Sequence, residues 1–198
     1  MESSFEKRFS ITDLIAKEFG PNSAEPWPDD AAMFQPQENE QSLLYQYADC
    51  LSVRAFLYMC ELPFTVESRT NAEQMSPSEE VPFIKAGKFV ISGYNSIVQF
   101  VGRKNVVLTE ELDEKEWCDM QALLSLCHRD LRYSEMYVCW MHLQSYKDVT
   151  VHRYGSVFPW PLNTLLPTIK AYQMRKRLNC FGYGDKTLNN VSPSQKKM

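Results

Sequence analysis

The strongest constraint on the fold is a change in hydrophobic pattern near residue 105. Before it, short apolar runs typical of strands alternate with helical stretches and with loops that contain proline or glycine. After it, the chain runs from Thr109 to about His142 without either residue, which predicts one long helix. Because such a run exceeds the usual length of a globular helix, we expect a bend near His128–Arg132. One face of this helix recurs at steps of three and four residues and is apolar except for its last member: Trp117, Met120, Leu124, Cys127, Leu131 and Ser134.

The first part of the chain is predicted to fold as a small α/β domain. Its main helix is expected to begin at an Asp49 N-cap and to end at Cys60, and a shorter helix covers Ile97–Gly102. Ala86-Gly87 stands between two strands, which is a strong signal for a hairpin. The four strands are expected at Ala31–Gln35, Phe64–Ser68, Val81–Lys85 and Lys88–Ser92.

This order of elements is the thioredoxin-like plan, in which parallel strands joined by a helix lead into an antiparallel pair. In that plan a proline with a cis peptide bond stands at the head of the third strand. Val81 and Pro82 occupy this position. Only about 5–6% of the bonds that precede proline are cis, so the expectation of a structural cis-proline here rests on the match to this plan.

A loop rich in aromatic residues and prolines, Arg153–Leu162, leads to a second helix at Asn163–Cys180. Rigid aromatic side chains held by prolines lose little conformational entropy on docking, which suits a binding anchor. An equal alternative is that they fill a groove between the two halves of the chain. The anchor residues are Phe158, Pro159, Trp160 and Pro161, and the exposed side of the second helix is expected to carry Lys170, Arg175, Lys176 and Arg177.

The formal net charge of −4 hides a strong asymmetry along the 198 residues. Residues 1–80 hold 15 acidic and 5 basic side chains, whereas residues 81–198 hold 10 acidic and 16 basic ones. This division favours an acidic protein partner or an anionic membrane surface over nucleic acid, since nucleic-acid binders are usually basic overall. The sequence holds no apolar run of about 18 residues, so we predict that it does not span a membrane by itself.

Cys50 is the best candidate for a catalytic residue. We expect it in the first turn of a helix, where the helix dipole lowers a thiol pKa. Against this, Asp49 opposes thiolate formation, and none of the six cysteines forms a C-x-x-C pair. We therefore predict no catalytic, cofactor-binding or metal-binding residue, and keep a thiol enzyme that uses Cys50 as the alternative.

Several long segments, in order, resemble the metaxin family, specifically its second branch. They include Ala55–Pro63, Asn71–Ser78, Arg153–Ser156 and Gly182–Leu188. Further matching segments are Ala24–Pro28, Val81–Ile84, Ile97–Val101 and Pro159–Asn163, so that the resemblance covers most of residues 24–188.

The resemblance implies a glutathione-transferase-like protein, α/β followed by all-α. It gives a thioredoxin-like domain at 24–104 and a helical domain at 105–188. An N-terminal extension at 1–23 and a tail at 189–198 lie outside the resemblance, and the polar composition of the tail predicts disorder. The helical domain is expected to be incomplete, because related domains carry several helices beyond the one that ends near Cys180. The transferase pair that holds the glutathione γ-glutamyl group aligns with Gly93 and Tyr94, which are unsuited to this role.

The function that the resemblance implies is non-catalytic and needs no cofactor. Metaxins are subunits on the cytosolic face of the mitochondrial outer membrane. They work with a partner metaxin and with the sorting and assembly machinery for β-barrel proteins, and they are linked to mitochondrial transport through motor-adaptor proteins. We place the partner interface at Phe158–Pro161 with Lys170, Arg175 and Arg177. The alternatives are a glutathione-dependent transferase and a shortened regulatory form that competes with a longer one.

Overall fold

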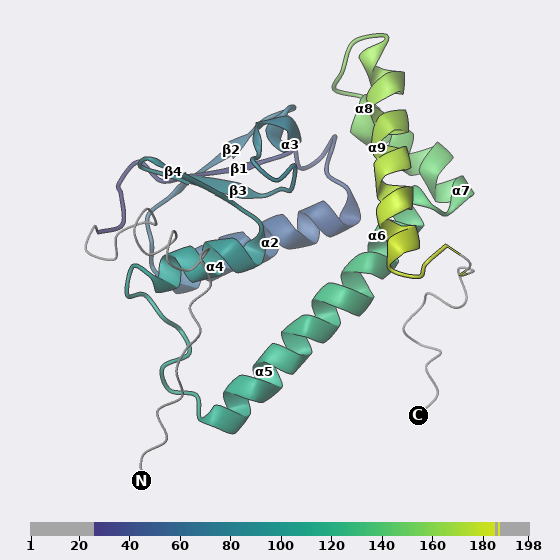
Figure 1. Cartoon of the computed structure of the whole chain (residues 1–198). Helices are drawn as coiled ribbons and strands as arrows, with labels where there is room; N and C mark the ends of the chain where they lie inside the picture. The colour runs from purple at the N-terminus through teal and green to yellow at the C-terminus, as the bar shows by residue number, and fades with distance from the viewer. Residues whose placement is uncertain (1–25, 185, 187–198) are drawn as a thin grey trace, which may run out of the picture.

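A computed structural model describes residues 26–184 and residue 186 (Figure 1). The expected N-terminal extension at 1–23 and tail at 189–198 lie outside these residues. A four-stranded sheet has the order β2-β1-β3-β4. Strands β1 and β2 are parallel, while β3 pairs antiparallel with both β1 and β4. The strands span Ala32–Gln35 (β1), Thr65–Ser68 (β2), Phe83–Ala86 (β3) and Phe89–Ser92 (β4).

The strand order and directions confirm the sequence prediction of a parallel pair that leads into an antiparallel hairpin. The hairpin turn contains Gly87, whose φ of 59° lies in the left-handed region that glycine adopts without strain. The Val81–Pro82 peptide bond at the head of β3 is cis, and so is Trp160–Pro161.

Two helices, α2 (Leu44–Met59) and α4 (Tyr94–Gly102), cover one face of the sheet (Figure 1). Their apolar sides meet Met33 and Ile84, which point from the two central strands into the same cluster. On the other face, the short helix α3 (Ala72–Met75) packs against Phe34 and Phe83, whose rings are stacked with centroids 4.8 Å apart. Strand β1 is therefore buried on both sides, as a central strand must be.

The start of α2 differs from the sequence prediction. Asp49 is inside the helix and not its N-cap, because the helix begins at Leu44 with Leu43 as the cap. The Gln46 side chain accepts a hydrogen bond from the Leu43 backbone N–H at 3.2 Å, and so satisfies a donor at the helix end. Cys50 consequently lies beyond the first turn.

The second half of the chain is helical. The long predicted helix is α5 (Glu114–Leu126), followed without a break by a π-helical turn, η1 (Cys127–Leu131), and by α6 (Arg132–Trp140). The π turn stands where the sequence predicted a bend. The helix begins later than expected, because the Asp113 carboxylate accepts a hydrogen bond from the Glu116 backbone N–H at 2.7 Å and caps it.

Four further helical segments complete this half, and they correct the predicted loop. Arg153–Gly155 belongs to a helix, whereas the connection to the last helix is confined to residues 156–161. The segments are α7 (Leu143–Ser145), η2 (Tyr146–Thr150), α8 (Val151–Gly155) and α9 (Leu162–Cys180).

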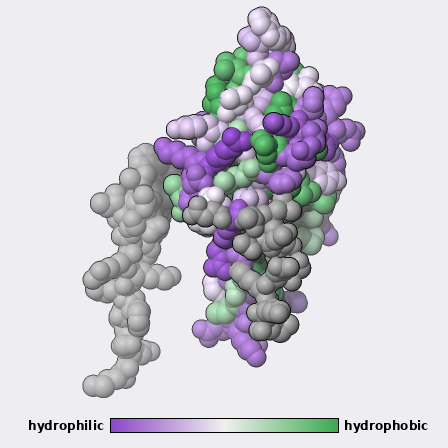
Figure 2. All heavy atoms as spheres, turned by 90° about the vertical axis from the view of Figure 1, so that its right-hand side faces the viewer, coloured by the Kyte–Doolittle hydropathy of each residue, from purple (hydrophilic) through white to green (hydrophobic). Residues whose placement is uncertain are grey.

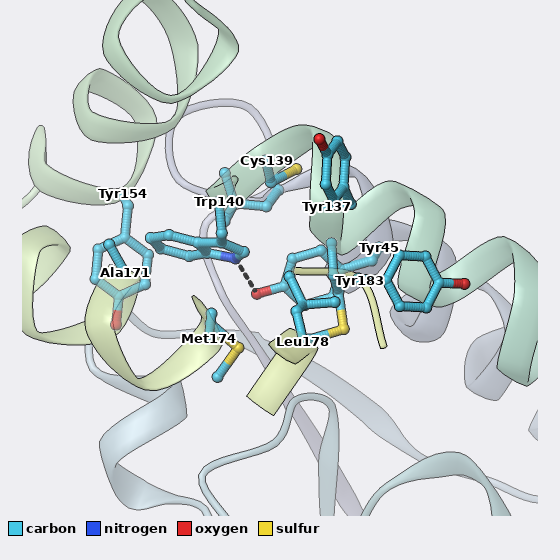
Figure 3. Close-up of a cluster of buried hydrophobic side chains, with 11 residues drawn as sticks. Tyr45, Tyr137, Cys139, Trp140, Tyr154, Ala171, Met174, Leu178 and Tyr183 are labelled. Carbon is cyan, nitrogen blue, oxygen red and sulfur yellow. Dashed lines mark hydrogen bonds between the residues drawn. The ribbon is translucent and has the colours of Figure 1, made fainter. Parts of the chain in front are cut away.

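A second hydrophobic cluster fixes the helices to the sheet-containing part (Figure 3). Trp140 is fully buried at its centre, between Tyr154 from α8 and Leu178 from α9. Leu43 and Tyr45, at the start of α2, enter the same cluster, so the two halves share one core. Helix α5 takes no part in it and extends away from the other helices (Figure 1).

Candidate functional site: the junction of sheet and helices

The junction between the sheet part (Ala32–Gly102) and the helical part (Glu114–Cys180) is built from charged side chains. Arg132, on α6, lies 3.1 Å from a carboxylate oxygen of Asp49 and 3.8 Å from one of Glu80. Arg177, on α9, donates two hydrogen bonds of 3.2 Å to the same Glu80 oxygen. Acidic groups of the sheet part therefore hold basic groups of both α6 and α9.

A second ion pair of the junction is almost completely buried. The Lys170 Nζ lies 2.6 Å from the Glu73 Oε1, and only 8% and 11% of the two side chains are exposed. The Tyr154 hydroxyl donates a hydrogen bond to the other carboxylate oxygen of Glu73. Burial, and then the Glu73 charge, raise the pKa of Tyr154, so its hydroxyl stays a donor at neutral pH.

Neutral hydrogen bonds extend this network into the shared core. The Trp140 indole N–H donates to the Tyr45 hydroxyl at 3.2 Å across the junction (Figure 3). The Thr150 hydroxyl donates to the Cys139 carbonyl at 2.7 Å, which ties η2 to α6. Since buried polar groups are costly unless paired, the Trp140–Tyr45 bond favours one relative placement of the two parts, while the Thr150–Cys139 bond stabilises the helical part itself.

The ion pairs of this junction account for part of the charge asymmetry of the sequence. Asp49, Glu73 and Glu80 come from the acidic first part, while their partners Arg132, Lys170 and Arg177 come from the basic remainder. Part of the asymmetry that predicted an acidic partner is thus satisfied within the chain.

The cavity at the junction is small. Its volume is ≈ 70 Å³, and its lining includes the charged groups of both ion-pair clusters. Pockets for small molecules usually have about 300–1,000 Å³, so the junction as it stands holds no ligand-sized cavity. The sequence prediction of no cofactor site agrees with this size but is not tested by it.

Cys50 is placed unfavourably for nucleophilic chemistry. It is 4% exposed and packs in the core between α2 and the sheet. Burial raises the pKa of the Cys50 thiol to about 12, with a smaller contribution from the neighbouring Asp49 charge. The expected lowering of its pKa by a helix N-terminus is therefore wrong, because the helix starts earlier and the residue faces inward.

The two residues that correspond to the glutathione-binding pair of transferases are Gly93 and Tyr94. Neither has an acidic side chain that could bind the amine of the ligand. Gly93 is the N-cap of α4 with a φ of 81° and offers only backbone atoms. The Tyr94 ring packs against Phe56 at a centroid distance of 6.3 Å. Among the described residues, no group of three or more His, Cys, Asp or Glu side chains is arranged to hold a metal ion.

The aromatic loop divides into a half-buried and an exposed part. Phe158 lies beside Tyr154 with ring centroids 6.5 Å apart, whereas the Trp160 side chain extends into solvent and is 84% exposed. Trp160 therefore does not fill a groove between the two halves. Figure 2 views the molecule from the side of the helical part, and green apolar patches lie there beside purple polar ones.

The predicted basic side of the second helix needs correction. Lys170 is buried in the ion pair with Glu73 and is not on the exposed side. Arg175 is partly buried, donates to the Trp140 carbonyl at 2.9 Å and lies over the Tyr146 ring. Arg177 is engaged with Glu80, which leaves Lys176 as an exposed cation of this helix.

The exposed side of α9 is instead an apolar stripe that the sequence reasoning missed. Its members recur at steps of three and four residues, and this periodicity could have predicted the stripe. We missed it because our interpretation of this helix rested on its basic residues. The stripe consists of Leu162, Leu165, Ile169 and Tyr172, which are 40%, 51%, 46% and 71% exposed.

The described residues contain no helix that combines the length and the apolar character needed to cross a lipid bilayer. The structure thus combines a four-stranded α/β part with a helical part, joined by one buried ion pair, by partly exposed ion pairs and by a shared core. Its exposed features are an aromatic loop and apolar helix faces.

Comparison with known proteins identifies the family. The family model of Tom37, described as an outer mitochondrial membrane transport complex protein, matches residues 50–171. The metaxin-2 homolog of Caenorhabditis elegans is 39% identical over 188 residues, which cover 95% of this chain and 81% of that protein. Metaxin-2 of Mus musculus is 42% identical over 180 residues, 90% of this chain and 68% of that protein.

Metaxin-2 of Homo sapiens is 42% identical over 169 residues, which cover 85% of this chain and 64% of that protein. The chain therefore belongs to the metaxin family of outer mitochondrial membrane transport complex proteins, as the sequence segments predicted.

Proposed function

We propose that this chain is a non-catalytic subunit of a transport complex on the cytosolic face of the mitochondrial outer membrane. The observation that carries the proposal is its membership of the metaxin family, together with a junction that contains ion pairs in place of a ligand-sized cavity. The burial of Cys50, whose pKa is raised to about 12, supports a role without thiol chemistry.

The fold that we propose is glutathione-transferase-like, with domains at 24–104 and 105–188. The strand order and the helices that cover one sheet face support this assignment. By the same resemblance, the subunit binds a partner metaxin, works with the sorting and assembly machinery for β-barrel proteins, and is linked to transport through motor adaptors. It is held at the membrane peripherally, through these proteins.

The partner interface that we propose lies around Phe158–Pro161 at the start of α9. Trp160 is the anchor, because a large aromatic side chain that is already exposed and held between two prolines loses little entropy when a partner covers it. The exposed Lys176 and the partly exposed Arg175 and Arg177 form the basic end of the same helix. Lys170 is excluded, since it belongs to the interior.

Co-purification from solubilised mitochondria tests this interface. Tagged wild-type chain and Trp160→Ala are compared for recovery of metaxin partners, with Tyr58→Ala as a matched control on the sheet part, where Tyr58 is 64% exposed. We expect Trp160→Ala to lose at least about tenfold in partner affinity, in the range of an aromatic hot spot. Full recovery with Trp160→Ala would remove the interface, and binding of glutathione in calorimetry would contradict the non-catalytic role.

A further inference from the structure

Two exposed helix faces in this molecule have matching patterns. The first is the α9 stripe, Leu162, Leu165, Ile169 and Tyr172, each at least 40% exposed. The opposite side of α9 is occupied, because Ala171, Met174 and Leu178 pack into the core around Trp140. Helix α9 thus has two apolar faces. One packs into the core of its own chain, and the other is not covered by any of the residues that the structure describes.

The second face lies on α5, which has no buried residue at all. Its apolar side chains recur at steps of three, four and three residues, and we call them the α5 stripe. Trp117 and Leu124 of this stripe are 48% and 41% exposed. The α5 stripe consists of Trp117, Met120 and Leu124 of α5 and of Cys127, the first residue of η1.

The two stripes agree in spacing and length. Both follow the sequence of steps three, four, three that places apolar side chains along one seam of a helix pair. Each spans ten residue steps, from residue 117 to 127 and from 162 to 172, or about 15 Å of helix. In an antiparallel pair, Trp117 stands opposite Tyr172, and Cys127 stands opposite Leu162.

The charges at the ends of the stripes are complementary in this antiparallel direction. One further step of four leads to Asp113, the N-cap of α5, and to Lys176 on α9. Asp113 is followed by the exposed Glu114 and Glu116, whereas residues 149–184 contain no acidic side chain. The acidic start of α5 therefore meets the basic end of α9, and a parallel pair would lose this match.

We propose that a second copy of this chain covers these faces, with the α5 stripe of one copy packed antiparallel on the α9 stripe of the other. The second copy is the occupant that fits these faces, since each stripe has the spacing, length and end charge that the other requires. This contact does not involve Trp160, and Lys176 is the one residue that it shares with the partner interface proposed above.

A two-fold arrangement makes this contact twice, α5 on α9 and α9 on α5. One helix pair alone is a small interface beside the roughly 1,600 Å² of standard stable complexes, so a stable dimer needs both contacts. Without closure, the same contact joins copies head to tail into longer chains. A dimer is therefore the expected species.

Sedimentation velocity of the purified full chain tests the proposal. We expect a concentration-dependent dimer, and we expect Leu124→Glu and Leu165→Glu each to raise its dissociation constant at least about tenfold, because each places a carboxylate in an apolar seam. Leu44→Glu is the matched control, since Leu44 is 58% exposed on α2 and belongs to neither stripe. Circular dichroism confirms that the variants remain folded.

A charge swap tests the direction of the pair. Glu114→Lys and Lys176→Glu should each weaken the dimer at low salt, and a chain that carries both changes should recover it. Glu40→Lys, an exposed reversal on the sheet part, should change nothing. A double variant that is weaker than either single one would contradict the antiparallel arrangement.

Cross-linking locates the contact at residue level. In Leu162→Cys, mild oxidation should form a disulfide between the new thiol and Cys127 of the other copy, and Cys127→Ser in the same chain should abolish it. A protein that stays monomeric at all concentrations, or a dimer that ignores both stripes, would overturn the proposal. In that case the stripes would be covered by segments of this chain outside the described residues or by a different partner.

Discussion

At the scale of single residues, the buried pair of Lys170 and Glu73 carries the largest expected effect. The two charged atoms lie 2.6 Å apart in the junction, and the Tyr154 hydroxyl donates to the same carboxylate. A buried charge without its partner is strongly unfavourable, whereas an exposed ion pair contributes little to stability. The consequence of removing one partner therefore depends on burial more than on distance.

We expect Lys170→Met to lower the free energy of unfolding by about 3–5 kcal/mol, because the Glu73 carboxylate is left buried and unpaired. Arg69→Ala breaks the exposed pair with Glu67, also 2.6 Å long, and should cost at most about 1 kcal/mol. Urea unfolding of both variants measures the difference. Equal costs would show that the Lys170 pair is not buried in solution.

Asp49 makes the stability of the junction depend on pH. Burial raises the pKa of Asp49 from 3.8 to about 6, against the opposing effect of the Arg132 charge. Because the folded-state pKa is the higher one, the folded protein binds the proton more tightly than the unfolded chain does. This contribution to stability is complete below about pH 4 and is lost as the pH rises through about 6.

The variant Asp49→Asn removes this titration. The stability of the wild type relative to Asp49→Asn should therefore fall between pH 4 and pH 6 and level off above that range. Unfolding free energies at several pH values give the curve. A difference between the two proteins that stays constant across this range would show that Asp49 titrates normally.

At the scale of elements, local sequence was sufficient for the strands and insufficient for the helix ends. The strands follow from short β-branched and aromatic runs bounded by turns, and the hairpin follows from Gly87. The start of α2 could not be predicted from Asp49, because the cap depends on the Gln46 side chain reaching back to Leu43. Helix α8 at Val151–Gly155 was not predicted, because its aromatic residue and its glycine suggested a loop.

The packing of α8 on α9 depends on a glycine at the end of α8. A Cβ atom at Gly155 would overlap the backbone carbonyl of Asn163 and approach the Pro167 ring at 3.4 Å. Backbone cannot yield as a flexible side chain can, so any larger residue must push the two helices apart.

We expect Gly155→Ala to lower stability by about 1–3 kcal/mol through this overpacking. Gly102→Ala is the control, since a Cβ atom there meets nothing within 4 Å and alanine favours the helix. Thermal unfolding compares the two variants. If Gly155→Ala were as stable as Gly102→Ala, the close approach of α8 and α9 would be refuted.

At the scale of the whole molecule, the ion pairs of the junction could not be predicted from the sequence. Glu73 and Lys170, like Glu80 and Arg177, stand nearly 100 residues apart, and no local pattern connects them. The composition showed only that acidic residues are concentrated in the first part of the chain and basic residues in the remainder. Whether those charges face each other or a partner depends on tertiary placement alone.

The family, in contrast, was accessible from the sequence, because matching segments are spread over most of the chain. The aromatic loop was found in part, and the exposure of Trp160 shows that its side chain does not fill a groove between the two halves, while its role as a binding anchor stays a prediction. The apolar stripe of α9 could have been predicted by its spacing, but whether a helix face is covered depends on the neighbours that the fold supplies.

We propose that the chain acts at the mitochondrial outer membrane as a bound subunit and not as an enzyme. The most direct test is the native size of the particle that contains it, measured in mild detergent extracts of outer-membrane vesicles. We expect the wild type in a particle much larger than 23.1 kDa, with Trp160→Ala shifted towards smaller sizes and Tyr58→Ala unchanged. Wild-type chain that is absent from these vesicles, or that migrates alone, would contradict the claim.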